Sequence, residues 1–175
     1  MRNQTVTCLE DIWPLQAELN RRAGFDTLSL GGRLAAAGVP NVPGGQEDPG
    51  PRGSGPPLGP AANAELLLKI GRALKNYIDA LLAECHELQE CLSWKHWYRE
   101  AREGRQYELK DVQNARVEAV DMLFFWVSIC QLLGMQPEDV YRLYAKKLGI
   151  NHRRQDEDRT QGEHASHEQE NRHVT

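Results

Sequence analysis

Apolar side chains recur at helical spacing along most of the chain, and no segment alternates apolar and polar residues for long. Pro137 suits the first turn of a helix, and Gly149 follows the last position of the periodic pattern that Pro137 begins. The pattern predicts an all-α fold, a small bundle of four to five helices. Its main helices are expected at residues 9–23, 62–98, 110–133 and from 137 to about 148.

Residues 31–60 interrupt the helical pattern. This segment holds nine of the 15 glycines and seven of the nine prolines, with few large apolar side chains. Because such a composition cannot offset the entropy lost on ordering, we expect a disordered Gly/Pro-rich loop there. The polar end of the chain is expected to be flexible in the same way. The prediction is therefore a single domain over residues 1–155 that contains this loop, followed by a flexible tail over 156–175.

Composition and charge exclude several classes of protein. The 175 residues include 21 Lys and Arg and 25 Asp and Glu, a formal net charge of −4, so a broad basic face for nucleic acid is not expected. The most apolar run, residues 122–135, is shorter than the ~20 residues that span a bilayer. The first residues carry acids and no long apolar stretch, and the four cysteines lack zinc-ligand spacing. We expect a cytoplasmic protein with reduced thiols, no membrane contact and no nucleic-acid partner.

Four carboxylates occupy positions where buried residues are expected. Glu84 and Glu87 fall on the inward face of the predicted helix over 62–98. Glu118 and Asp121 are the only charged residues between Val117 and Pro137, in a helix that is apolar nearly all round and is therefore expected to be buried. Burying an unpaired carboxylate costs several kcal/mol, so a positive charge must compensate.

Three interpretations of these acids remain open on the residues alone. The compensating charge could be a divalent metal, and a set of oxygen ligands favours Mg²⁺ or Mn²⁺ over zinc. It could instead be a structural network of salt bridges, or the acids could point to water. The basic side chains within reach by sequence are Arg72, Lys75, Lys95 and Arg116.

The two acidic pairs also resemble a known motif. Glu84-x-x-Glu87 followed by Glu118-x-x-Asp121 resembles the metal motif of the all-α nucleoside triphosphate pyrophosphohydrolases, a superfamily that includes the MazG proteins and the dimeric dUTPases. Four blocks, which cover about half of the chain, resemble the dimeric dUTPases in the order of that family. They are LQAELN (15–20), ECHELQECLSWKHW (84–97), NARVEAVDMLFFWVS (114–128) and KLGINHRRQD (147–156).

The resemblance implies a MazG-like fold, a homodimer and Mg²⁺-dependent hydrolysis of dUTP to dUMP and pyrophosphate, with dUDP as a second substrate. It implies that Glu84, Glu87, Glu118 and Asp121 are both the metal ligands and the catalytic residues, with Glu84 favoured as the base. In such a reaction metal and carboxylate activate water, and no protein nucleophile is needed.

The resemblance further implies how the substrate is bound. Gln16 and Asn20 would meet the edge of a uracil, and Phe125 would stack on the base, although the two amides could equally be a solvated helix flank. The other implied contacts involve side chains with plainer interpretations, as core tryptophans and as a basic helix end. They are Trp94 and Trp97 at the base or sugar, Lys95 at a phosphate, and Lys147, Asn151 and Arg154 at the outer phosphates.

Two departures from the family pattern keep other functions open. Phe124-Phe125 stands where the family commonly has His-Phe, and the family's Gly-Tyr after Arg-Gln is absent. The first alternative is a MazG-like pyrophosphohydrolase for dCTP or another nucleoside triphosphate. The second, from a different class, is a helical interaction module without enzymatic activity.

Overall fold

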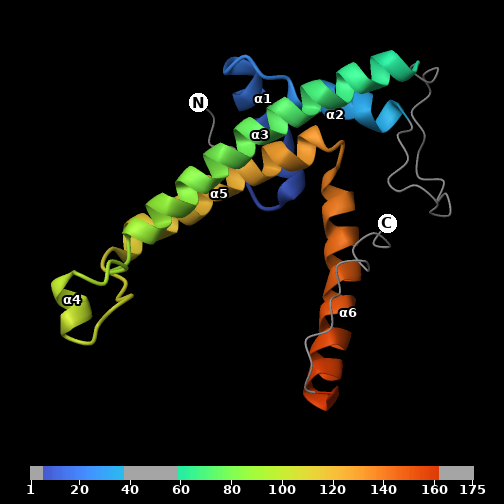
Figure 1. Ribbon diagram of the computed structural model, residues 1–175. Helices are drawn as coiled ribbons and strands as arrows, with labels where there is room; N and C mark the ends of the chain where they lie inside the picture. Colours follow the sequence, from blue (N-terminus) through green and yellow to red (C-terminus); the bar gives the residue numbers. More distant parts are fainter. Residues whose placement is uncertain (1–5, 38–58, 162–175) are drawn as a thin grey trace.

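The computed structural model describes residues 6–37 and 59–161, with side chains described up to residue 156. These residues form six helices and no strand, so the predicted all-α class is confirmed, with more helices than the four to five expected. Figure 1 shows their arrangement. The helices are α1 (Leu9–Arg22), α2 (Thr27–Ala36), α3 (Pro60–Glu90), α4 (Arg99–Arg102), α5 (Val112–Leu132) and α6 (Pro137–Gln161).

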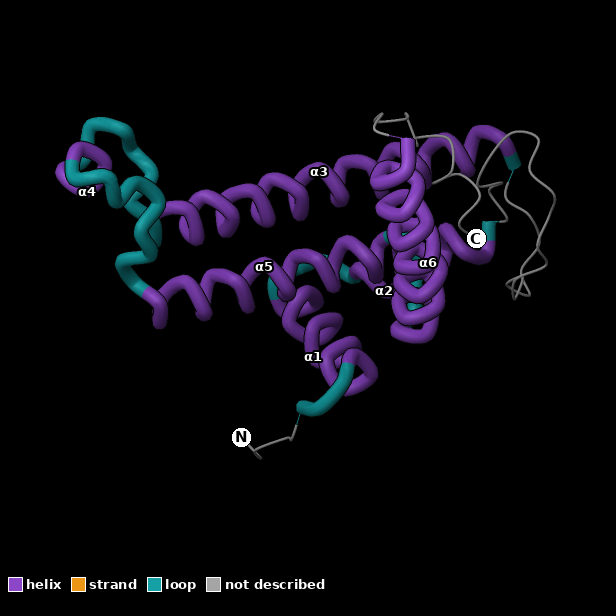
Figure 2. Tube along the Cα trace, turned by 90° about the horizontal axis from the view of Figure 1, so that it is seen from below, coloured by secondary structure: helices purple, strands orange, loops and turns teal. Residues whose placement is uncertain are grey.

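The long helices α3 and α5 form the frame of the molecule. They lie side by side along their length, and the short helix α4 lies in the connection at one end of the pair (Figures 1 and 2). Helices α1 and α2 pack against the other end. One buried cluster joins α1 to α5 through Trp13, Val127 and Cys130. A second cluster, which includes Leu66 and Ile70, joins α3 to the end of α2.

Helix α2 corrects the prediction of a loop over 31–60, because residues 31–36 are helical. The Asp26 side chain caps this helix by accepting a hydrogen bond from the Ser29 backbone N–H. Gly31 lies against α5 so closely that a Cβ there would fall 1.8 Å from the backbone oxygen of Gln131. The glycine therefore permits close helix packing rather than disorder. Residues 38–58 of the predicted loop lie outside the described residues.

The predicted helix over 62–98 begins at Pro60 and ends earlier than expected, at Glu90. Beyond it the backbone of Ser93 pairs across the connection, donating to the Glu108 carbonyl and accepting from the Tyr107 N–H. This tertiary pairing removes Ser93 from the helix, since its N–H and C=O are already bonded. The helix predicted over 110–133 is confirmed within two residues at each end.

Helix α6 also corrects a prediction, because it continues through Gly149 to Gln161 instead of ending near residue 148. A single glycine inside a helix costs only about 1 kcal/mol. Residues 156–161, which were predicted to belong to a flexible tail, are therefore helical, and 162–175 lie outside the described residues.

The chain turns sharply between α5 and α6. Gly134 has a positive φ of 75° and its N–H donates to the Gln131 carbonyl, an arrangement that commonly closes a helix. Within the described residues no single helix has the length and apolar character to cross a membrane; α5 and α6 reach that threshold only together, across a bend of 100°. Cys8, Cys85, Cys91 and Cys130 are all free in the structure.

Burial divides the α3–α5 pair into two parts. We call residues 60–76 and 123–132 the covered half and residues 77–90 and 112–122 the open half. The covered half contains nearly all buried side chains of the two helices, whereas Glu118 is the only buried one in the open half. Val117 and Val120 of the open half are exposed. The expectation that this helix is buried all round is therefore wrong for the open half of a single chain.

Candidate metal and substrate site

Three of the four predicted carboxylates converge between α3 and α5. Glu84, Glu118 and Asp121 each offer one oxygen atom, and these oxygens all lie within 4.8 Å of one another. Glu118 is only 7% exposed, and the other two are half-buried. The antiparallel pairing of the helices brings Glu84 opposite the two acids of α5, which are three residues apart and so share a face.

The three carboxylates of this cluster repel one another, and the fold holds them together despite that repulsion. Burial, the negative charges of Glu87, Asp121 and Glu118, and a hydrogen bond with Glu118 all raise the pKa of Glu84. A raised carboxyl pKa means that ionising this group in the folded chain costs free energy. A cation placed among the three oxygens would remove that cost.

Basic side chains do not supply this cation within the described part of the chain. None of the three clustered carboxylates forms an ion pair there; Lys75 pairs with Asp79, and Lys95 pairs with Glu90. The interpretation of the acids as a salt-bridge network is therefore not supported. The interpretation as acids that point to water fails for Glu118, which is buried.

Glu87 differs from the other three predicted ligands. It was expected on the inward face with Glu84, but its side chain is exposed and is not part of the convergent group. Its charge nevertheless reaches Glu84, because it contributes to the raised pKa of that residue. The structure thus brings together three of the four acids and leaves Glu87 at their border.

Asn114, which was not predicted as a site residue, holds one of the carboxylates in place by a hydrogen bond. Its side-chain Nδ2 donates to Glu118 Oε1 at 3.0 Å and also approaches the Sγ of Cys91 at 3.4 Å. Asn114 lies one helical turn before Glu118, so an i, i+4 pairing between the amide and the acid was visible in the sequence. The bond fixes the rotamer of the most buried carboxylate in the cluster.

A cavity of about 550 Å³ opens beside the carboxylates and extends toward α1. Its volume falls within the usual range for small-molecule sites. Glu84 and Asp121 line one part, and Gln16, Asn20 and Phe125 line another. Five of the predicted site residues therefore share one cavity. The residues that complete it are Leu19, Ala23, Phe25, Asn76, Tyr77, Ala80 and Phe124.

Aromatic rings form one wall of this cavity. Phe125 lies with its ring centroid 6.5 Å from that of Tyr77, which in turn makes an edge contact with Phe25 at 6.1 Å. Such rings offer flat apolar surfaces on which a planar base can stack. Tyr77 and Phe25 were not predicted as site residues, although Tyr77 lies two turns before Glu84 on the same helix.

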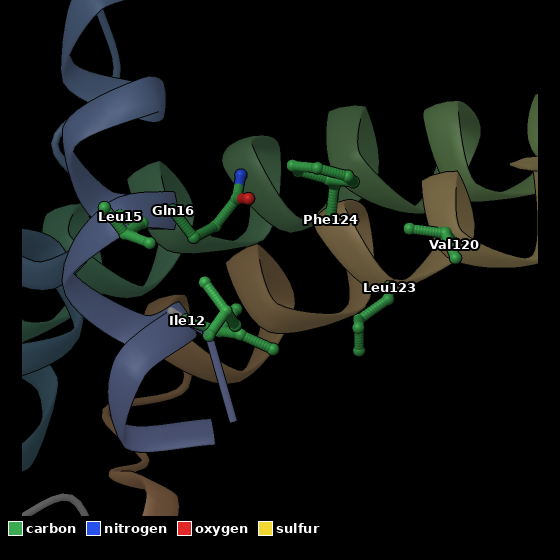
Figure 3. A pocket seen from close by; sticks show the side chains of 7 residues that line it. Ile12, Leu15, Gln16, Val120, Leu123 and Phe124 are labelled. Carbon is green, nitrogen blue, oxygen red and sulfur yellow. The ribbon is translucent and has the colours of Figure 1, made fainter. Parts of the chain in front are cut away.

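A smaller cavity of about 250 Å³ adjoins the first and is almost wholly apolar. Figure 3 shows its lining residues, which include Ile12 and Leu15 of α1 and Val120 and Leu123 of α5. The two cavities share Gln16 and Phe124. Gln16 is thus the polar side chain that both spaces have in common.

The remaining predicted substrate residues lie away from the cavities in the single chain. In the connection after α3, Trp94 donates its indole N–H to Glu90, and the ammonium of Lys95 lies over the rings of Trp94 and Tyr98. Trp97 is 55% exposed in the same region. On α6, Lys147, Asn151 and Arg154 lie on a helix that leads away from α5 (Figure 1). None of these six side chains lines either cavity.

The carboxylate cluster fits a hard divalent cation. All of its donors are oxygen atoms, their separation allows one ion to contact all three residues, and the ligands that zinc prefers, His and Cys, are absent from the group.

In comparisons with protein families, with curated proteins and with solved structures, nothing matched this chain.

Proposed function

We propose that the protein is a Mg²⁺-dependent nucleotide pyrophosphohydrolase with a MazG-like fold, which hydrolyses dUTP to dUMP and pyrophosphate and accepts dUDP as a second substrate. One observation carries the proposal. A group of carboxylates that has no basic partner among the described residues opens into a cavity whose other walls offer amides and aromatic rings. That combination matches the two ends of a nucleotide, a polyanionic phosphate chain and a planar polar base.

The residues divide the work of binding accordingly. Glu84, Glu118 and Asp121 would hold Mg²⁺ or Mn²⁺, and Glu87, at the border of the cluster, is the fourth proposed ligand. When bound, the metal neutralises phosphate charge and lowers the pKa of a coordinated water. Asn114 keeps Glu118 in place through its 3.0 Å hydrogen bond. Phe125 supports the base, and Gln16 recognises its edge.

The chain supplies the base for the reaction as well. Glu84 lines the cavity beside Asp121. We propose it as the base that takes a proton from the water that attacks phosphorus. Proton transfer by a positioned base typically contributes about 10²–10⁴-fold to the rate. Pyrophosphate leaves as the P–O bond to the nucleoside monophosphate breaks, and no covalent enzyme intermediate forms.

We assign the phosphate-binding residues Lys147, Asn151 and Arg154 to a homodimer, together with the aromatic segment that contains Trp94 and Trp97. Within one chain none of them is among the residues that line the cavities beside the acids, whereas a second chain could present them. The exposed apolar side chains of the open half, among them Leu82, Val117 and Val120, provide a surface for that contact. The free cysteines agree with a cytoplasmic location.

The direct test is pyrophosphate release from a panel of deoxynucleotides in the presence of Mg²⁺. dUTP is expected to be the best substrate and Glu118→Gln to lower turnover about 10²-fold or more. Glu65→Gln is the matched control, because Glu65 is an exposed acid of α3 outside the cluster. Binding of Mn²⁺, followed by calorimetry, should be lost in the first variant and kept in the second.

Each outcome has a distinct meaning. Preference for dCTP would favour the related pyrophosphohydrolase of different base specificity. If the protein neither binds metal nor releases pyrophosphate, a helical interaction module is the better interpretation. Comparable rates for purine and pyrimidine triphosphates would remove the base-recognition role of Gln16.

The dimer can be tested by complementation. Glu118→Gln and Arg154→Ala are each expected to be inactive alone. If one site uses Glu118 from one chain and Arg154 from the other, an equal mixture recovers about a quarter of wild-type activity, because half of the dimers are mixed and each holds one intact site. No recovery after subunit exchange would place both residues in the same chain's site.

A further inference from the structure

A chain of buried polar side chains leads from the backbone of α1 back to the cavity. It begins at the carbonyl of Trp13, which accepts a hydrogen bond from Gln131 Nε2 at 2.8 Å. Gln131 Oε1 accepts from the hydroxyl of Thr27 at 2.6 Å. This series of hydrogen bonds continues through Asn20 to Gln16. The four side chains in it are at most 5% exposed: Gln131, Thr27, Asn20 and Gln16.

The first bond fixes the direction of every later one. A backbone carbonyl can only accept, so Gln131 must turn its NH₂ toward Trp13 and its oxygen toward Thr27. The Thr27 hydroxyl donates its only hydrogen to that oxygen. It can therefore only accept from its next neighbour, Asn20 Nδ2, which lies at 3.1 Å. The orientation of each amide follows from the anchor, and flipping any one of them would place two acceptors or two donors face to face.

The same reasoning sets the orientation of Gln16. Since Asn20 turns its Nδ2 toward Thr27 and Ser128, its Oδ1 accepts from Gln16 Nε2 at 2.9 Å. The second hydrogen of Gln16 Nε2 goes to Ser128 Oγ at 3.1 Å. Both hydrogens of the Gln16 amide are thereby used within the protein. Its Oε1 makes no hydrogen bond to the described residues.

Gln16 Oε1 is the last group in this series of hydrogen bonds, and it lies at the cavities. Gln16 lines both of them, and Figure 3 shows its amide in the space between α1 and the ring of Phe124. Asn20 also lines the larger cavity, but its amide groups are all bonded internally. A ligand in the cavity therefore meets one oriented acceptor and no amide donor from this pair.

From this polarity we propose that Gln16 Oε1 is an acceptor-only recognition point that selects a pyrimidine presenting an N–H, with the ring N3–H of uracil as its partner, and that Thr27 and Gln131 are positioning residues for it. The inference rests on the proposed function for the nature of the ligand. It reassigns Asn20 from a contact with the base to a residue that orients Gln16. It also limits the ligand, because the ring N3 of cytosine is an acceptor and only the exocyclic amine of that base could meet the oxygen.

Binding of nucleosides tests the acceptor without any chemistry. The protein is titrated with deoxyuridine and with N3-methyldeoxyuridine, which lacks the N–H but keeps both carbonyls. Methylation is expected to weaken binding by about tenfold or more, since the bound ligand would then cover the Gln16 oxygen without pairing it. Deoxycytidine and its N4-dimethyl derivative form the second pair, and an effect of methylation confined to that pair would overturn the assignment of the uracil N3–H. Equal affinity within both pairs, or no binding of any nucleoside, would overturn the acceptor itself.

The positioning role is tested at Thr27, far from the ligand. Thr27→Val removes the hydroxyl at almost unchanged volume, so the chain is interrupted between Gln131 and Asn20. The preference for deoxyuridine over its N3-methyl derivative is expected to fall several-fold, whereas Thr27→Ser, which keeps the hydroxyl, should retain it. Unchanged preference in a folded Thr27→Val protein would contradict the role. The nucleoside comparison in the wild-type protein decides the acceptor even if this variant does not fold.

These outcomes separate the inference from the proposed function. Selective binding of deoxyuridine without pyrophosphate release from dUTP would uphold the acceptor and reject the hydrolase. Pyrophosphate release from dUTP and N3-methyl-dUTP at equal efficiency would do the reverse.

Discussion

The two halves of the α3–α5 pair differ in what they bury and therefore in what they can do alone. In the covered half, α1 and α2 pack on α5 and bury Val127, Gln131 and Leu132 almost completely. In the open half the only buried side chain is that of Glu118. The covered half thus has the composition of a folded core, whereas the open half combines exposed apolar residues with a buried acid. Its composition suits a surface that becomes covered when metal, substrate or a second chain binds.

The cavity lies where the two halves meet. Of its amides, Gln16 and Asn20 come from α1, which packs on the covered half, and Asn76 comes from the covered half of α3; its carboxylates come from the open half. A site of this kind has one rigid end and one end whose charge must be compensated from outside. We therefore expect base recognition to be built into the single chain, and phosphate binding to require additional groups.

The largest difference between the halves is expected in stability. Leu132 is fully buried in the covered half, whereas Leu82 is 52% exposed in the open half. Leu132→Ala should lower the free energy of unfolding by about 2–5 kcal/mol. Leu82→Ala should change it by less than about 0.5 kcal/mol at concentrations where the chain is monomeric. Urea unfolding of both variants measures this, and equal losses in the monomer would show that the open half is packed within one chain.

The next largest effect is expected where α2 meets α5. Gly31→Ala would place a methyl group against the Gln131 backbone oxygen and should destabilise the fold by about 1–3 kcal/mol. The matched control is Gly32→Ala, because nothing lies within 4 Å of a Cβ built there and alanine favours a helix by up to about 1 kcal/mol. Thermal unfolding should shift in opposite directions for the two neighbours. A shift in the same direction would contradict the close contact.

The contrast between these glycines explains what the sequence could and could not predict. The helix periodicity around Leu9 to Leu19 and the lone acids in an apolar helix are local signals, and the corresponding helices and carboxylates lie as expected. The glycines at 31 and 32 look alike in sequence, yet only one touches another helix. Composition indicated disorder for both, because the reason for Gly31 lies 100 residues away, at Gln131.

Long-range pairing also accounts for the other gaps in the sequence analysis. The end of α3 is set by backbone bonds between Ser93 and the segment at Tyr107 and Glu108, which no local propensity encodes. The amides of Gln16 and Asn20 fitted two interpretations, a base-binding pair or a solvated flank. Their burial excludes the solvated flank, and in our proposal the orientation imposed by Thr27 and Gln131 gives the two amides different roles.

A smaller effect is expected from Asn114, the residue that orients the buried carboxylate of the open half. Asn114→Ala removes the bond to Glu118 Oε1 and should weaken Mn²⁺ binding by about 10–100-fold with little change in stability. Gln113→Ala is the control, since that exposed neighbour makes no described contact with the cluster. Calorimetry on both variants is the measurement. Unchanged affinity in Asn114→Ala would show that Glu118 keeps its position without the amide.

The smallest expected effect is a dependence of stability on pH that arises at Glu84. Because its pKa is raised in the folded chain, the native state holds this proton more tightly than the unfolded state does. The contribution of Glu84 to the free energy of unfolding is fully present at pH values below the ordinary glutamate pKa. It is lost as the pH rises through the raised pKa of the folded chain. Glu84→Gln cannot ionise and should therefore stabilise the metal-free protein at pH 8, by roughly 1–3 °C in Tm after allowance for solvent screening, and hardly at pH 4.

Metal should reverse this difference in Tm, which makes the same variant a probe of the open half. With saturating Mg²⁺ the wild-type protein gains stability by binding the ion, whereas Glu84→Gln has lost a ligand and gains less. The order of the two Tm values at pH 8 is therefore expected to reverse between the metal-free and the Mg²⁺-bound protein. A Tm of Glu84→Gln above that of the wild type under both conditions would mean that the three acids repel one another without serving a cation. In that case we would expect a protein surface, and not a metal ion, to cover the open half.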